Sequence, residues 1–145
     1  MPTYIKIFLA SVLSKFLIFF IGKYHTKKVN NLFFDLDLSE GIDLRLFLNF
    51  LEEKKLYKCL KKLLRPNKQY NMIDVGANIG SVSLSLASIF KNSNVLAFEP
   101  SFYAFKKLKK NLNLNSRLEK RIKLFNSSIS NFKKIKNSSY SSWKL

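Results

Sequence analysis

Two carboxylates stand where they could share one ligand. Asp74 lies near the end of the run Asn71–Val75, which suits a buried strand, and a loop of small residues follows it. Glu99 ends a second apolar run, about twenty residues after that loop. Because a parallel sheet binds its ligand beyond the carboxyl ends of its strands, we expect both acids at one site.

The loop between Gly76 and Gly80 disfavours a phosphate ligand. A dinucleotide fingerprint would place glycine at positions 76, 78 and 81, whereas this chain has Asn78 and Ser81. The carboxylate of Asp74 would repel phosphate, but it suits an ammonium or sulfonium group. S-adenosylmethionine carries both cations, and its carboxylate could lie near the electropositive start of the following helix. We therefore expect S-adenosylmethionine as the cofactor.

Each residue of this group has a role that its chemistry suggests. Gly76 and Gly80 would allow positive φ and close backbone approach, and Asn78 is among the few other residues that tolerate that conformation. With Asp74, they are expected to hold the methionine end of the cofactor. Glu99 could accept hydrogen bonds from both ribose hydroxyls. Singly, each could be an ordinary strand-end acid or turn residue, but their order and spacing together favour cofactor binding. The sequence identifies no catalytic base and no metal site.

The elements that must position these residues alternate between strand and helix. Val82, Leu84 and Leu86 alternate as a strand would, but the crossover between parallel strands favours a helix there. The expected order is strand 71–75, helix 81–90, strand 95–99, helix 101–112 and strand 122–125. Ser101 is expected to cap the second helix. This predicts an α/β fold, the first β-α-β-α-β half of a doubly wound, Rossmann-like sheet.

Three motifs in succession resemble one known family. The stretches Asp74–Gly80, Phe98–Pro100 and Leu108–Asn115 are similar to motifs of the FkbM-type S-adenosylmethionine-dependent methyltransferases, over roughly residues 35–130. The resemblance implies a class I methyltransferase fold and O-methylation of a hydroxyl on a sugar or secondary metabolite. It also implies a small-molecule or glycan acceptor, and related folds commonly place an adenine contact in a loop such as residues 126–128.

The resemblance also implies that the family's second half is not within this sequence. Members continue to a Lys-x-Asp-x-Glu-Gly motif and further strands, and no such motif occurs before Leu145. The expected organisation is an apolar helix in 1–30, a strand and helix lead-in in 31–70 and half a methyltransferase domain in 71–145. Two alternatives stay open: a non-catalytic fragment, and a basic module that binds membranes or nucleic acid.

Composition narrows these alternatives. The chain has 145 residues, 47% of them hydrophobic, which is enough for a small packed core. Its 26 Lys and Arg against 9 Asp and Glu give a net charge of +17. Most of this excess falls on expected helix exteriors without a basic-aromatic recognition motif, so nucleic acid is disfavoured as a partner. Cys59 is the sole cysteine, which suits a reducing compartment, and the sole histidine, His25, offers little for a metal site.

The segment Tyr4–Ile21 is almost wholly apolar and interrupted by Lys6 and Lys15. As a helix it would span about 27 Å, just short of a bilayer core, and a lysine near the centre would cost roughly 3 kcal/mol. It is expected to pack on a membrane surface or on a further part of the protein, or else to span. A signal peptide is disfavoured, because the chain lacks a basic start and a small-residue cleavage site after the apolar segment. The rest of the chain, after this segment, is expected in the cytoplasm. Where the segment associates with a membrane, the chain is expected at its inner face.

The lead-in between residues 31 and 70 combines both periodicities. Residues 32–38 alternate as a half-buried strand, with Phe34, Leu36 and Leu38 inward and Asp35 and Asp37 outward. Residues 42–64 have apolar positions that predict one long or two short helices, and residues 131–145 are polar and predict a loop.

Overall fold

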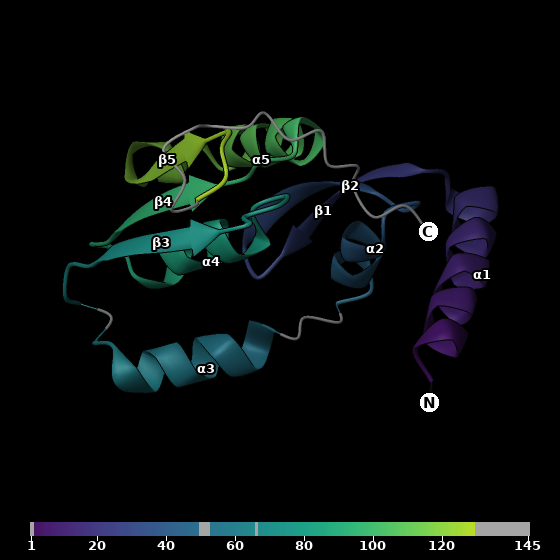
Figure 1. Ribbon diagram of the computed structural model, residues 1–145, viewed down its shortest axis with the longest axis horizontal. Helices are drawn as coiled ribbons and strands as arrows, with labels where there is room; N and C mark the ends of the chain where they lie inside the picture. Colours follow the sequence, from purple (N-terminus) through teal and green to yellow (C-terminus); the bar gives the residue numbers. More distant parts are fainter. Residues whose placement is uncertain (1, 50–52, 66, 130–145) are drawn as a thin grey trace. The chain divides into compact units, whose positions relative to one another are not determined.

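The computed structural model describes residues 2–49, 53–65 and 67–129 (Figure 1). The chain divides between residues 51 and 52 into two compact units, so the expected lead-in of residues 31–70 is shared between them. The loop expected over residues 131–145 lies outside the described part of the chain.

The described residues of the N-terminal unit form two helices and one antiparallel hairpin. Its elements are α1 (Thr3–Ile21), β1 (Tyr24–Val29), β2 (Leu32–Asp37) and α2 (Gly41–Phe47). Asn30 and Asn31 form the turn of the hairpin with φ of 50° and 64°, a conformation that asparagine tolerates better than most residues. The apolar helix expected within residues 1–30 is confirmed as α1, but β1 was not predicted. Its lysines and histidine hide the usual strand pattern, because Val29 is its single buried residue.

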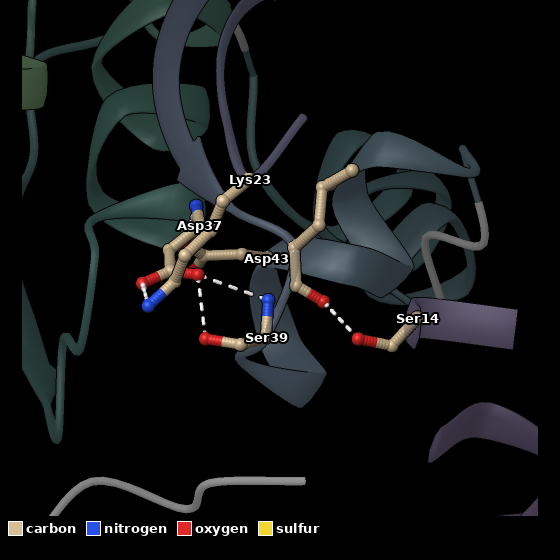
Figure 2. A network of polar contacts seen from close by, with 6 residues as sticks. Ser14, Lys23, Asp37, Ser39 and Asp43 are labelled. Atoms are coloured by element: carbon tan, nitrogen blue, oxygen red, sulfur yellow. Dashed lines mark hydrogen bonds and ion pairs between the residues drawn. The ribbon is translucent and has the colours of Figure 1, made fainter. Parts of the chain in front are cut away.

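Strand β2 forms the core of this unit. Phe34, Leu36 and Leu38 are buried, as predicted. The prediction that Asp37 faces solvent is wrong, since Asp37 is only 5% exposed. The carboxylate of Asp37 accepts bonds from the backbone and hydroxyl of Ser39, at 2.9 and 2.6 Å, and lies 3.3 Å from Nζ of Lys23 (Figure 2). These partners satisfy a buried charge that period-two alternation would have placed in water.

The second unit contains helix α3 (Glu53–Leu63) and a three-stranded parallel sheet. The strands are β3 (Asn71–Val75), β4 (Asn94–Phe98) and β5 (Ile122–Phe125), in the order β3-β4-β5. Helices α4 (Ser81–Ile89) and α5 (Phe102–Leu114) connect them, and a short 3₁₀ helix, η1 (Ser116–Arg121), leads into β5. The predicted α/β, Rossmann-like order is confirmed (Figure 1). Residues 42–64 form two helices, α2 and α3, rather than one.

The two faces of the sheet differ in burial. Met72, Val95 and Ile122 are in register across the three strands, and of these Val95 and Ile122 are buried. On the other face, Ile73 and Val75 are 61% and 62% exposed. Alternate residues of a strand point to opposite faces, so one face packs as a core while the other carries exposed apolar side chains.

Local signals explain both connecting helices. The hydroxyl of Ser101 accepts a bond from the backbone N–H of Ala104, which confirms it as the N-cap of α5. Leu108 and Leu112 face inward, whereas Lys109 and Lys110 are exposed. In α4 the ambiguous alternation resolves as a helix, with Leu84, Leu86 and Ala87 among its buried residues.

Candidate functional site

The loop after β3 is fixed against the end of β4. The backbone N–H groups of Gly76 and Ala77 both donate to the carbonyl of Phe98, at 2.8 and 3.0 Å. Gly76, Asn78 and Gly80 have φ of 78°, 48° and 91°, so the predicted positive φ values are confirmed. The loop therefore has a defined backbone that only glycine and a few other residues adopt readily.

Glu99 joins this loop to the start of α5. Its Oε2 accepts a bond from the backbone N–H of Asn78, and its Oε1 accepts one from the N–H of Ser101, each at 2.8 Å. The residue is 6% exposed. Its backbone is also held, because its N–H donates to the carbonyl of Phe125 and its carbonyl accepts from the amide of Asn126. A carboxylate fixed at both oxygens is already oriented before any ligand arrives.

Asp74 faces helix α4. It pairs in register with Ala97, on the helix-covered face of the sheet, and its Oδ2 accepts a bond from the hydroxyl of Ser83 at 2.5 Å. Burial raises the pKa of Asp74, and the hydrogen bonds from Ser83 offset this in part. A half-buried carboxylate of this kind lacks full solvation, so a cation placed beside it would stabilise its charged form.

Gly80 has a packing role that the sequence did not reveal. A Cβ at this position would lie 2.5 Å from Cδ1 of Leu108, which is fully buried in α5. The amide of Asn111, also in α5, donates to the carbonyl of Ile79 at 2.8 Å. The end of the glycine loop is thus packed and hydrogen-bonded onto α5, with Leu108 and Asn111 as its supports.

Sequence reasoning missed Ser83 and Asn111 as partners of the predicted residues. Ser83 is one of several serines in α4, and nothing local distinguishes it. Asn111 offered a signal, since it follows Leu108 by three residues and so lies on the inward side of the expected helix. The structure shows it buried. A helix interior disfavours asparagine unless its amide has a partner.

The residues present fit an adenosyl ligand. Each carboxylate oxygen of Glu99 accepts one N–H and has the capacity for a second hydrogen bond, such as one from a ribose hydroxyl. Gly76 is exposed, and apart from the residue itself and its two chain neighbours no atom lies within 4 Å of the position its Cβ would take, so a ligand can approach the backbone there. Within residues 2–49, 53–65 and 67–129, no cluster of three His, Cys, Asp or Glu could hold a metal ion.

The structure brings the predicted residues into one connected region, although by different contacts. Asn78 and Glu99 are bonded directly, and Gly76 is tied to Phe98, the residue before Glu99. Asp74 lies at the end of β3 but is bonded to α4 rather than to the loop. In the loop of residues 126–128, the side-chain amide of Asn126 donates to the carbonyls of Glu99 and Pro100, and the adenine contact expected in this loop stays a prediction.

Comparison with solved structures shows the fold. No protein-family model and no curated protein sequence matches the chain. A SAM-dependent methyltransferase from Agrobacterium tumefaciens matches with a TM-score of 0.56 and 16% identity, over 74% of this chain and 33% of that one. TYW2 of P. horikoshii, in complex with MeSAdo, matches with a TM-score of 0.55 and 19% identity, over 88% and 51%. TYW2 of M. jannaschii, in complex with AdoMet, gives 0.52 and 20%, over 70% and 42%.

These likenesses define the class of fold. The second unit has part of the Rossmann-like α/β fold of class I S-adenosylmethionine-dependent methyltransferases, with the three-stranded parallel sheet as its centre. The chain spans about half the length, or less, of the structures it matches.

Proposed function

We propose that the second unit binds S-adenosylmethionine and supplies the cofactor half of an O-methyltransferase of the FkbM type. The observation that carries this proposal is the carboxylate of Glu99, which is held by the N–H groups of Asn78 and Ser101 at the end of β4. The FkbM assignment rests on the sequence motifs, and the acceptor it suggests is a hydroxyl of a sugar or another small molecule.

The proposed binding mode follows from the contacts of each residue. Glu99 would accept hydrogen bonds from the ribose through the acceptor capacity that its two backbone partners leave. The open side of Gly76 would let the cofactor lie against the loop backbone. Asp74 would lie nearest a cationic end, where a positive charge offsets the desolvation that raises its pKa. The bound cofactor would supply an electrophilic methyl group, and this unit's contribution is to hold it in one orientation.

A second candidate is cofactor binding without catalysis. Ile73 and Val75 expose an apolar sheet face, and β4 is the sole neighbour of β3 among the described strands. In a doubly wound fold both faces are covered, and the ligand crevice lies where the strand order reverses, beside the first strand. Methyl transfer to sugar hydroxyls by the 145-residue chain would favour the enzyme, and binding without transfer would favour this second candidate.

Removal of the Glu99 charge tests the binding site. Glu99→Gln should weaken binding of S-adenosylmethionine by about 2 kcal/mol, or roughly thirtyfold in Kd, since charge-assisted bonds to the ribose are lost. Isothermal titration calorimetry on the whole chain gives this difference directly. Glu119→Gln, at an exposed acid of η1, removes the same charge and should leave Kd unchanged. Equal affinity of the two variants would contradict the proposal.

Glutamine at position 99 also leaves one backbone N–H with a poorer hydrogen-bond partner, so Glu99→Gln affects folding as well as binding. A second variant separates these two effects. Gly76→Ala places a methyl group in open space and should block the cofactor. Gly22→Ala controls for the strain of a side chain at positive φ, since Gly22 has φ of 91° and ψ of 173°, a region almost confined to glycine, with open space around its Cβ position. The change at Gly76 should cost about 1–2 kcal/mol of stability and the change at Gly22 about 1–3 kcal/mol, while only the change at Gly76 should abolish binding.

A further inference from the structure

Helix α1 exposes an apolar surface unusual for a soluble monomer. It has 19 residues, 6% of its 18 most apolar consecutive residues are buried, and by length and composition it could cross a membrane. Phe19, Phe8, Phe20 and Phe16 are 83%, 67%, 64% and 59% exposed. Apolar patches of this extent on soluble proteins mark a surface that another phase or molecule covers.

One contact fixes how the helix is turned relative to its own unit. Ser14 is 3% exposed, and its hydroxyl donates to the carbonyl of Leu38 at 2.7 Å (Figure 2). At about 100° per residue around the helix axis, Val12 and Phe16 lie roughly 160° from Ser14 in opposite directions, so both are nearly opposite it. Phe8 and Phe19 lie roughly 120–140° away. The aromatic side of α1 therefore points away from the residue that anchors it.

The lysines of α1 border this aromatic side. Lys15 lies about 100° from Ser14 in one direction and Lys6 about 80° in the other, so they flank the apolar side on both edges. Both are exposed. The first acidic residue of the whole chain is Asp35, whereas five lysines precede it. One lysine at each edge of the exposed aromatic side, with no acid nearby in sequence, complements an anionic lipid surface.

The anchoring contact disfavours a spanning orientation. Ser14 lies seven residues before the helix end, or about 10 Å along the axis. Its partner Leu38 is backbone-bonded to Lys23, whose Nζ lies 3.3 Å from the carboxylate of Asp37. A helix that spanned the bilayer with this contact intact would draw Leu38 and the non-helical backbone beside it into hydrocarbon, where such backbone is not tolerated. A helix lying in the plane of the surface keeps this backbone outside the hydrocarbon.

We propose that α1 docks the chain on an anionic membrane by lying in the plane of the interface. Its aromatic side enters the lipid, Lys6 and Lys15 reach the headgroups, and the bond from Ser14 to Leu38 holds the N-terminal unit above it. This proposal does not depend on cofactor binding, and its test needs no cofactor.

Co-sedimentation of the whole chain with vesicles tests the partner. Binding should be at least tenfold tighter to vesicles with 30% phosphatidylglycerol than to pure phosphatidylcholine, at about 1 kcal/mol for each lysine near the surface. Phe16→Ser with Phe19→Ser should weaken binding at least tenfold. Leu63→Ser with Phe102→Ser, which changes two side chains 74% and 62% exposed in the other unit, should weaken it less than twofold.

Charge and topology give two further readouts. Lys6→Gln with Lys15→Gln should remove most of the preference for anionic lipid, whereas Lys61→Gln with Lys62→Gln, the same charge change on α3, should retain it. Alkaline carbonate should release the wild-type chain from the vesicles, as expected for a helix at the interface. Retention after carbonate would show a spanning helix and overturn the proposal. Self-association without vesicle binding would overturn it too, in favour of a second copy.

Discussion

At the scale of single residues, the two predicted acids are held in different ways. Glu99 is bonded at both carboxylate oxygens by backbone N–H groups, and one of these belongs to Asn78 in the glycine loop. Asp74 is bonded by the hydroxyl of Ser83, and burial raises its pKa. One acid is therefore satisfied before the cofactor arrives, while the other keeps a desolvated charge that a cation would stabilise.

Asp74→Asn should increase stability and decrease cofactor affinity. A raised folded-state pKa means that the stability linked to Asp74 is fully present below about pH 4 and is lost as the pH rises through that pKa. The variant should therefore gain stability relative to wild type as the pH rises from 3 to 7. Its binding of S-adenosylmethionine should weaken by about 1.5 kcal/mol, so that Kd rises roughly tenfold. Urea unfolding at several pH values and calorimetry at pH 7 check both parts. A pH-independent stability difference would contradict the assignment.

A buried acid in the N-terminal unit shows the opposite dependence on pH. Burial alone would raise the pKa of Asp37, but the hydrogen bonds from Ser39 and the charge of Lys23 outweigh burial and lower it. Its contribution to stability is therefore present above about pH 4 and is lost as the pH falls through the lowered pKa.

Asp37→Asn should reduce the protection of the hairpin at neutral pH. Amide hydrogen exchange in β1 and β2, followed between pH 7 and pH 3, should show faster exchange in the variant at neutral pH, with a loss of about 1–3 kcal/mol in local stability. The difference from wild type should shrink at the acidic end. A constant difference over the whole range would contradict the role of the charge.

At the scale of elements, the glycine loop depends on α5 as much as on the strands. Gly80 packs against Leu108, and Asn111 bonds the carbonyl of Ile79. A loop supported in this way keeps its backbone N–H groups in place, including the one that Asn78 donates to Glu99. The proposed site is therefore built jointly by β3, β4 and α5.

Gly80→Ala should destabilise the second unit more than a positive φ alone explains. The added methyl group would lie 2.5 Å from Cδ1 of Leu108, whereas at Gly76, which has φ of 78°, the same position lies in open space. Strain and overpacking together should cost about 2–4 kcal/mol at Gly80, against about 1–2 kcal/mol for Gly76→Ala. Thermal unfolding by circular dichroism compares the two variants. Equal costs would show that Leu108 moves aside freely.

At the scale of the whole molecule, the sequence predicted the second unit better than the first. The strands around Ile73, Leu96 and Leu124 are apolar runs closed by turn residues, and the parallel connection required helices between them. Strand β1 escaped prediction because its lysines and histidine hide the alternation of a strand, although β2 follows it directly across the turn at Asn30 and Asn31. The burial of Asp37 escaped prediction because its ion-pair partner, Lys23, comes from a different part of the chain, before β1.

The candidate site shows the same division. The positive φ values of the loop followed from residue types, since glycine and asparagine are the residues that tolerate them. The bonds from Asn78 to Glu99, from Ser83 to Asp74 and from Asn111 to Ile79 could not be predicted, because they join residues nine to thirty-two positions apart. Residue types thus indicated the place of the site, and tertiary packing determined its geometry.

The central claim is that Glu99, oriented by the glycine loop, holds the ribose of S-adenosylmethionine. A crystal structure of the whole chain with the cofactor measures this most directly. We predict both ribose hydroxyls about 3 Å from the Glu99 carboxylate, with the bonds from Asn78 and Ser101 retained. A cofactor bound away from Glu99, or no binding at about 1 mM cofactor in calorimetry, would contradict the claim.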